Sequence, residues 1–148
     1  MTLDKTYGGT EDDVGMSIIQ TADGNFVVSG RTASFGKGGD DIWLMKIDSK
    51  GDEVWNTTFG GKKDDAAFQV VELLNGYALV GRTESGSDNT RIILIRTDSR
   101  GNKIWEKVYR GSSGTSLHAT SDGGFAIIGR IDDEKSGKDA LVIKTDSL

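Results

Sequence analysis

The chain has 148 residues and a formal net charge of −5 at pH 7, with 21 glycines, no proline and no cysteine. The acidic balance argues against a nucleic-acid partner, and the lack of cysteine excludes disulfides and thiolate metal sites. No apolar run is long enough to cross a bilayer, and no segment resembles a secretion signal, so we expect no membrane span.

The sequence repeats itself three times with a period near fifty residues. Each unit carries a Gly-Arg pair and an Asp-Ser pair. They stand at Gly30-Arg31, Gly81-Arg82 and Gly129-Arg130, and at Asp48-Ser49, Asp98-Ser99 and Asp146-Ser147. Such a period is typical of repeat architectures, in which each unit buries its apolar faces against a neighbour. We place the units at about 4–55, 56–105 and 106–148 of a single domain, 1–148.

Every unit is predicted to contain the same short strands, separated by turns rich in Gly, Asn and Asp. The segments are 16–20, 26–30, 42–47 and 53–59, then 68–72, 77–81, 92–97 and 103–109, then 115–119, 125–129 and 140–145. Asx-Gly turns between apolar runs indicate hairpins, and the β-branched and aromatic content of the runs favours strands. No segment keeps a helical spacing of apolar residues, so we expect an all-β chain with almost no helix.

Two all-β architectures fit these units, a β-propeller and a β-trefoil. Successive side chains of residues 42–47 point to opposite faces of the predicted strand. One face carries Ile42 and Leu44, and the other carries Trp43 and Met45. A strand that is apolar on both faces is covered on both faces, as in the middle of a propeller blade. We therefore predict a propeller of four-stranded blades, three per chain, with the trefoil as the alternative.

Several motifs also resemble the repeats of bacterial and archaeal PQQ-like β-propellers. They are Tyr7-Gly8-Gly9, Asp12-Asp13, Asp23-Gly24-Asn25-Phe26, residues 41–48, Gly51-Asp52 and Trp55. The resemblance covers nearly the whole chain and implies an extracellular or cell-surface protein; without it, a cytoplasmic location stays open. The quinone-binding residues of the quinoprotein dehydrogenases are not recognisable, so no cofactor is expected.

The third unit lacks a fourth strand, whereas residues 2–9 align with residues 55–61 and 105–111 and place Leu3 at the position of a tryptophan. Three blades do not easily close a ring, and an open arc leaves more apolar surface exposed than monomers usually tolerate. We therefore expect a six-bladed homodimer, in which strand 2–9 of each copy completes the third blade of its partner.

The longer polar loops at one end of the propeller are the predicted binding face. The candidate ligand-binding residues there are Asp12, Asp13, Asp64, Asp65, Arg31, Arg82, Arg130 and Phe35. The carboxylates form an acidic mouth for a cation or basic ligand, or they serve the structure by capping turns or by pairing with the arginines. Phe35 lies in a Gly-rich loop with little core to join, which makes it a candidate ligand contact. The single histidine has no His or Cys beside it, so no metal site is expected.

These features predict a non-enzymatic propeller module for binding or assembly, with its ligand on the loop face or in the axial channel. One alternative is a carbohydrate-binding half-propeller, although Trp55 and Trp105 are predicted to be packing staples at the blade edge. Others are a hydrolase or lyase that uses the loop carboxylates, and a fragment or engineered propeller without present function. The predicted partners are a second copy of the chain and a small molecule or glycan.

Overall fold

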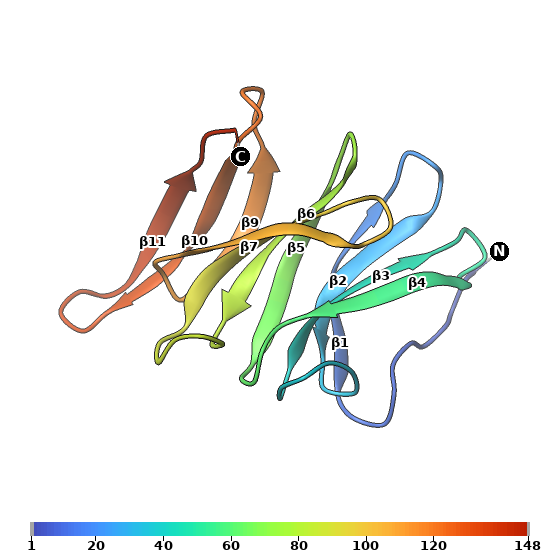
Figure 1. Ribbon diagram of the computed structural model, residues 1–148, viewed down its shortest axis with the longest axis horizontal. Coiled ribbons are helices and arrows are strands. Elements are labelled where there is room, and N and C mark those ends of the chain that lie inside the picture. The colour runs from blue at the N-terminus through green and yellow to red at the C-terminus, as the bar shows by residue number, and fades with distance from the viewer. Residues whose placement is uncertain (1, 148) are drawn as a thin grey trace.

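The computed structural model describes residues 2–147, and within them eleven antiparallel strands form three sheets without any helix (Figure 1). The predicted all-β fold is confirmed; the ends of the predicted domain, Met1 and Leu148, lie outside the described residues. The first sheet contains β1 (Asp13–Gln20), β2 (Phe26–Thr32), β3 (Asp41–Ile47) and β4 (Glu53–Phe59). The second contains β5 (Asp65–Leu73), β6 (Gly76–Thr83), β7 (Arg91–Thr97) and β8 (Lys103–Tyr109). The third contains β9 (Ser113–Ala119), β10 (Phe125–Asp133) and β11 (Gly137–Lys144).

Each sheet is a meander in which strands pair in chain order, as in a propeller blade. Two sheets have four strands as predicted, and the third has three, with β11 at its edge. The predicted units cut through β4 and β8, because the sheets run from 13 to 59, from 65 to 109 and from 113 to 144. Residues 2–9 belong to none of these strands.

The recurring Asp-Ser pairs cap the turns between the third and fourth strands. One carboxylate oxygen of Asp48 accepts hydrogen bonds from the backbone N–H groups of Lys50 and Asp52, both at 2.8 Å. The chain reverses at Gly51, whose φ of 79° lies in the region that favours glycine. Asp98 caps the corresponding turn of the second sheet in the same way.

The recurring glycine of the Gly-Arg pairs has a steric cause. The first strand of each sheet bulges against the second strand at this point. A Cβ atom added at Gly30 or Gly81 would lie 1.9 Å from a backbone carbonyl oxygen of the neighbouring strand, and at Gly129 the distance would be 2.4 Å. Only a residue without a side chain fits there.

The sheets stack face to face and bury their apolar side chains between them. The core between the first and second sheets includes Leu44, Val70 and Leu79, and the core between the second and third includes Leu94 and Ile127. All are essentially inaccessible to solvent. This stacking of meanders is blade-like, and the three sheets form a row rather than a closed ring (Figure 1).

The expectation that both strand faces are covered holds for the third strands of the first two sheets, β3 and β7, and fails for β11 of the third. Every residue of β3 is buried, and Ile92 to Ile95 of β7 are buried as well. In β11, by contrast, Leu141 is buried whereas its neighbour Val142 is 70% exposed. The third sheet has a neighbouring sheet on one face only, whereas the outer face of β3 is also covered by the segment that contains Tyr7.

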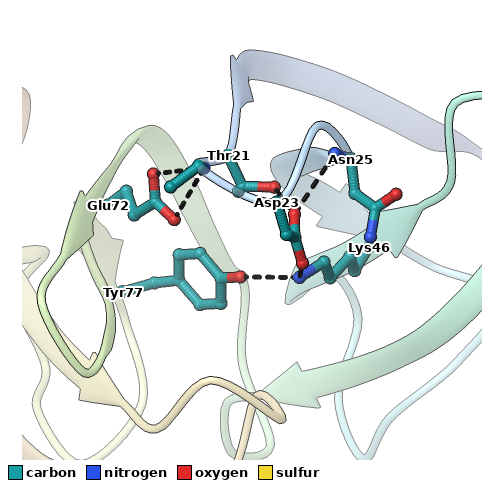
Figure 2. A network of polar contacts seen from close by, with 7 residues as sticks. Thr21, Asp23, Asn25, Lys46, Glu72 and Tyr77 are labelled. Atoms are coloured by element: carbon teal, nitrogen blue, oxygen red, sulfur yellow. Dashed lines mark hydrogen bonds and ion pairs between the residues drawn. The ribbon is translucent and has the colours of Figure 1, made fainter.

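A polar network ties the first sheet to the second at the end where β2 begins (Figure 2). The Lys46 ammonium group donates to the carboxylate of Asp23 at 2.6 Å and to the hydroxyl of Tyr77, on the second sheet, at 3.3 Å. The side chain of Lys46 is only 10% exposed, so Asp23 supplies the opposite charge that a buried ammonium requires. The hydrogen bond from Lys46 holds the pKa of Asp23 well below its usual range.

The pKa of Asp23 makes stability depend on pH in the acid range. An unfolded aspartate takes up its proton near pH 4, whereas folded Asp23 stays ionised to lower pH, so the free energy of unfolding decreases as the pH falls below about 4. We expect Asp23→Asn to be less stable than the native chain at pH 7, because Lys46 loses its counter-charge, but to lose stability less steeply below pH 4. Urea titrations from pH 7 to pH 2 measure both effects.

Asp122→Asn is the matched control for this prediction. Asp122 has the same low pKa because it accepts a hydrogen bond from Lys144, but the side chain of Lys144 is 46% exposed. Its loss should therefore cost less at pH 7 than the loss of Asp23. A pH profile for Asp23→Asn that runs parallel to the native one would contradict the role of this carboxylate.

Candidate functional site

The carboxylate of Asp13 joins the loop before β1 to the loop after β2. It accepts hydrogen bonds from the Gly9 N–H at 2.8 Å, from the Ser34 hydroxyl at 2.7 Å and from the Thr32 hydroxyl. Burial raises the pKa of Asp13, but the bonds from Thr32, Ser34 and Gly9 outweigh burial and leave it below the ordinary value. The group therefore stays ionised to hold two loops together.

Asp65 repeats this arrangement in the second sheet. Its carboxylate accepts from the Gly61 N–H at 2.9 Å and from the Ser85 hydroxyl at 2.8 Å, and the residue is almost completely buried. Because Gly9 and Ser34 bind Asp13 in the same way, the contact belongs to the repeat. The geometry favours turn caps over an acidic mouth for these two residues.

The neighbouring carboxylates have weaker or different contacts. Asp12 is exposed, and its backbone carbonyl accepts from the Ala33 N–H at 2.9 Å. A carboxylate oxygen of Asp64 accepts from the Asp40 N–H at 3.1 Å. Across residues 2–147, no group of three or more His, Cys, Asp or Glu side chains is arranged to hold a metal ion.

The three repeated arginines lie at the same end of the sheets, but they do not pair with the carboxylates above. Arg31 pairs with Asp40 at 2.5 Å, Arg82 approaches Glu84 at 3.6 Å, and Arg130 pairs with Asp132 at 2.9 Å. Of the two structural interpretations of the Asp-Asp motifs, turn caps or pairs with these arginines, the contacts of Asp13 and Asp65 fit the caps and not the pairs. The reason is visible in the loops, whose N–H and hydroxyl groups already bind Asp13 and Asp65.

No protein-family model matches this chain, and no curated protein matches it significantly. The resemblance to PQQ-like propellers stays a prediction. No helix within the described range 2–147 is long and apolar enough to cross a membrane.

The repeated arginines contribute to an open cavity of about 850 Å³ at the loop end of the three sheets. Five arginines line it: Arg31, Arg82, Arg91, Arg110 and Arg130. Two of them, Arg91, the first residue of β7, and Arg110, which directly follows β8, were not among the predicted site residues. A signal for Arg110 was present in the repeat, since it replaces the first glycine of the Gly-Gly pair found at Gly60.

Phe35 lies outside this cavity, next to the first sheet. Its ring centroid is 6.1 Å from that of Trp43, and the ring remains 40% exposed. Trp43 is buried, and its indole N–H has no hydrogen-bond acceptor among residues 2–147. Phe35 therefore joins an aromatic pair at the outer face of the first sheet rather than standing free in its loop.

The repeated tryptophans lie where packing staples are expected. The ring of Trp55 on β4 is centred 6.1 Å from that of Tyr77 on β6, and Trp105 on β8 meets Phe125 on β10 at 6.2 Å, edge to face. Each tryptophan thus reaches from the outer strand of one sheet onto the next sheet. Such aromatic pairs stabilise the stacking of the sheets.

Proposed function

We propose that this protein is a self-assembling β-propeller binding module, in which two copies complete one six-bladed ring. The observation that carries the proposal is the bare outer face of the third sheet. Val142 stands at the repeat position of Leu44 and Leu94, and Ile128 at that of Val80. Leu44, Leu94 and Val80 are 0% exposed, whereas Val142 is 70% and Ile128 is 40% exposed. In the first two sheets these positions pack against the next sheet, whereas in the third sheet they have no next sheet to pack against.

The first sheet is incompletely covered on the complementary face, where β1 remains exposed. Ile18 on β1 is 62% exposed, although its counterparts Val70 and Leu117 lie buried against a preceding sheet. The first sheet of a second copy could therefore pack against the third sheet of this chain in the same way as the second sheet packs against the first. Burying such faces is the main source of stability in stacked repeats.

Residues 3–9 support the same assembly, because they lie on the first sheet as residues 55–61 lie on the second. A Cβ atom added at Gly51 would come within 2.8 Å of the Leu3 side chain, and one added at Gly101 within 2.8 Å of Trp55. The Tyr7 hydroxyl also donates to the Gly51 carbonyl at 2.8 Å. The segment thus occupies the place of the outer strand of a preceding sheet.

The third sheet offers the edge that this segment needs. Its strand order ends at β11, which has no strand beyond it in the described structure, whereas β3 and β7 each pair with a fourth strand. Unpaired edges readily accept an extended segment through backbone hydrogen bonds. In the proposed ring, residues 2–9 of one copy pair with β11 of the other.

Light scattering of the purified protein at micromolar concentration tests the proposal. We expect a mass twice the 15.9 kDa of one chain, and loss of the dimer in Val142→Lys, which places a charge on the bare face. Leu74→Lys is the matched control, because Leu74 is 98% exposed at the β5–β6 turn, and this variant should remain dimeric. A native mass of one chain, or a dimer that Val142→Lys leaves intact, would overturn the proposal.

The enzymatic and carbohydrate-binding alternatives draw no comparable support from the geometry. Asp13 and Asp65 are engaged by loop hydrogen bonds, and Trp55 and Trp105 are engaged in packing between sheets. The binding function therefore rests on the loop end of the sheets, where the arginines gather.

A further inference from the structure

We infer that the arginine-lined cavity binds a small polyanion, a molecule that carries several phosphate or carboxylate groups. Five of the seven arginines of the chain line this one cavity, although the chain as a whole has a net charge of −5. They come from all three sheets: Arg31 from the first, Arg82, Arg91 and Arg110 from the second or its end, and Arg130 from the third. The fold thus gathers five positively charged side chains in one cavity of a chain whose net charge is negative.

The charge of the cavity is only partly compensated. Arg31, Arg82 and Arg130 each have a carboxylate partner. Arg91 donates its Nε–H to the backbone carbonyl of Tyr109 at 3.3 Å, and Arg110 is exposed; neither forms an ion pair within residues 2–147. Two guanidinium groups are therefore available to an incoming anion.

The remaining lining suits the same ligand chemistry. Neutral donors lie beside the arginines at Asn89, Thr90, Ser112 and Ser113, and two carboxylates, Asp132 and Glu134, complete the polar wall. Guanidinium groups bind phosphate and carboxylate oxygens through paired N–H donors, which fixes both the charge and the geometry of the ligand. The volume of about 850 Å³ is in the range of sites that bind small molecules.

The carboxylates of the cavity set the selectivity. Asp132 is already paired with Arg130, so Glu134 is the lining carboxylate that disfavours a weak anion, and a ligand must carry enough negative charge to reach Arg91 and Arg110 together. Because all the lining residues belong to one chain, the site does not rest on the proposed dimer. The cavity at this end of the sheets is thus lined mainly by basic residues, whereas the four predicted carboxylates suggested an acidic opening.

Titration calorimetry at low salt, with tripolyphosphate in one arm and citrate in the other, tests this inference and separates phosphate from carboxylate ligands. We expect saturable binding of at least one probe, weakened by added salt because exposed charges are screened. Arg91→Gln/Arg110→Gln should weaken binding about tenfold or more, because it removes two charged donors. A thermal unfolding scan confirms that this variant is folded.

The control is Lys50→Gln/Arg100→Gln, which also removes two positive charges. Both residues are exposed in turns at the opposite end of the sheets. Arg100 follows the far end of β7, about 20 Å from Arg91 along this seven-residue strand, and Lys50 lies in the corresponding turn after β3. The control variant should bind as the native chain does. Absence of binding for both probes, or an equal loss in the two variants, would overturn the inference. Monomeric Val142→Lys should keep the site, so a failed dimer and a failed anion site are distinguishable.

Discussion

Gly81→Ala is expected to lower the free energy of unfolding by about 3 kcal/mol or more, the upper end of the effect of overpacking. The added Cβ would lie 1.9 Å from the carbonyl oxygen of Ala66 and 2.8 Å from the Cα atom of Ala67. Both residues are buried between the sheets, so the backbone of β5 has little room to move away. Urea denaturation followed by tryptophan fluorescence measures the loss.

Gly15→Ala is the control for this change. It lies at the corresponding bulge, in β1 itself, and the nearest atom to an added Cβ is a methyl carbon of Val28 at 3.4 Å. That distance is at the limit of ordinary van der Waals contact, and we expect a change within about 1 kcal/mol. Equal losses at Gly15 and Gly81 would show that the close approach of the two strands is not what selects glycine.

Leu94→Ala is expected to cost about 2–5 kcal/mol, because it leaves a cavity between two packed sheets. Leu94 is 0% exposed in the core that the second sheet shares with the third. The free energy of unfolding, measured by urea denaturation with the native chain in parallel, gives the loss directly.

The repeat supplies the control, since Val142 stands at the same position one unit later. Val142→Ala, measured at a concentration low enough to keep the chain monomeric, should change stability by less than about 0.5 kcal/mol, as at other exposed sites. At higher concentration the loss should grow, because association stabilises the folded chain by mass action. A large loss that is the same at every concentration would mean that Val142 is already covered within one chain.

The strands and turns could be predicted because their causes are local. Residues 42–47 are apolar on both faces of the strand, which predicts a sheet covered on both faces. The turns at Asp48 and Asp98 contain the Asp and Gly residues that favour tight turns. The lack of a fourth strand in the third unit could also be predicted, because this unit has no segment that corresponds to residues 53–59 and 103–109. The ion pair between the buried Lys46 and the half-exposed Asp23 could not be predicted, because it depends on how deeply the second sheet covers the first.

The arginine cavity could be predicted only in part. Arg31, Arg82 and Arg130 share a repeat position, so their common end of the sheets follows from the period. Arg91, the first residue of β7, and Arg110, which follows β8, are arginines in the second unit only, and the stacking of the sheets brings them to the same cavity as the repeated arginines. The ion-pair partners of Arg31, Arg82 and Arg130 depend on loop conformations, which cannot be predicted from the spacing of residues.

In the proposed assembly through the free edge of β11, the angle between sheets becomes a determinant of solubility. A head-to-tail joint closes only when its rotations add up to a full turn; otherwise the same contact continues into an open filament. A substitution that tilts one sheet by a few degrees, without unfolding it, would turn a finite particle into a fibre. In the proposed assembly, the geometry of the cores that contain Leu44 and Leu94 would thus decide ring closure as well as stability.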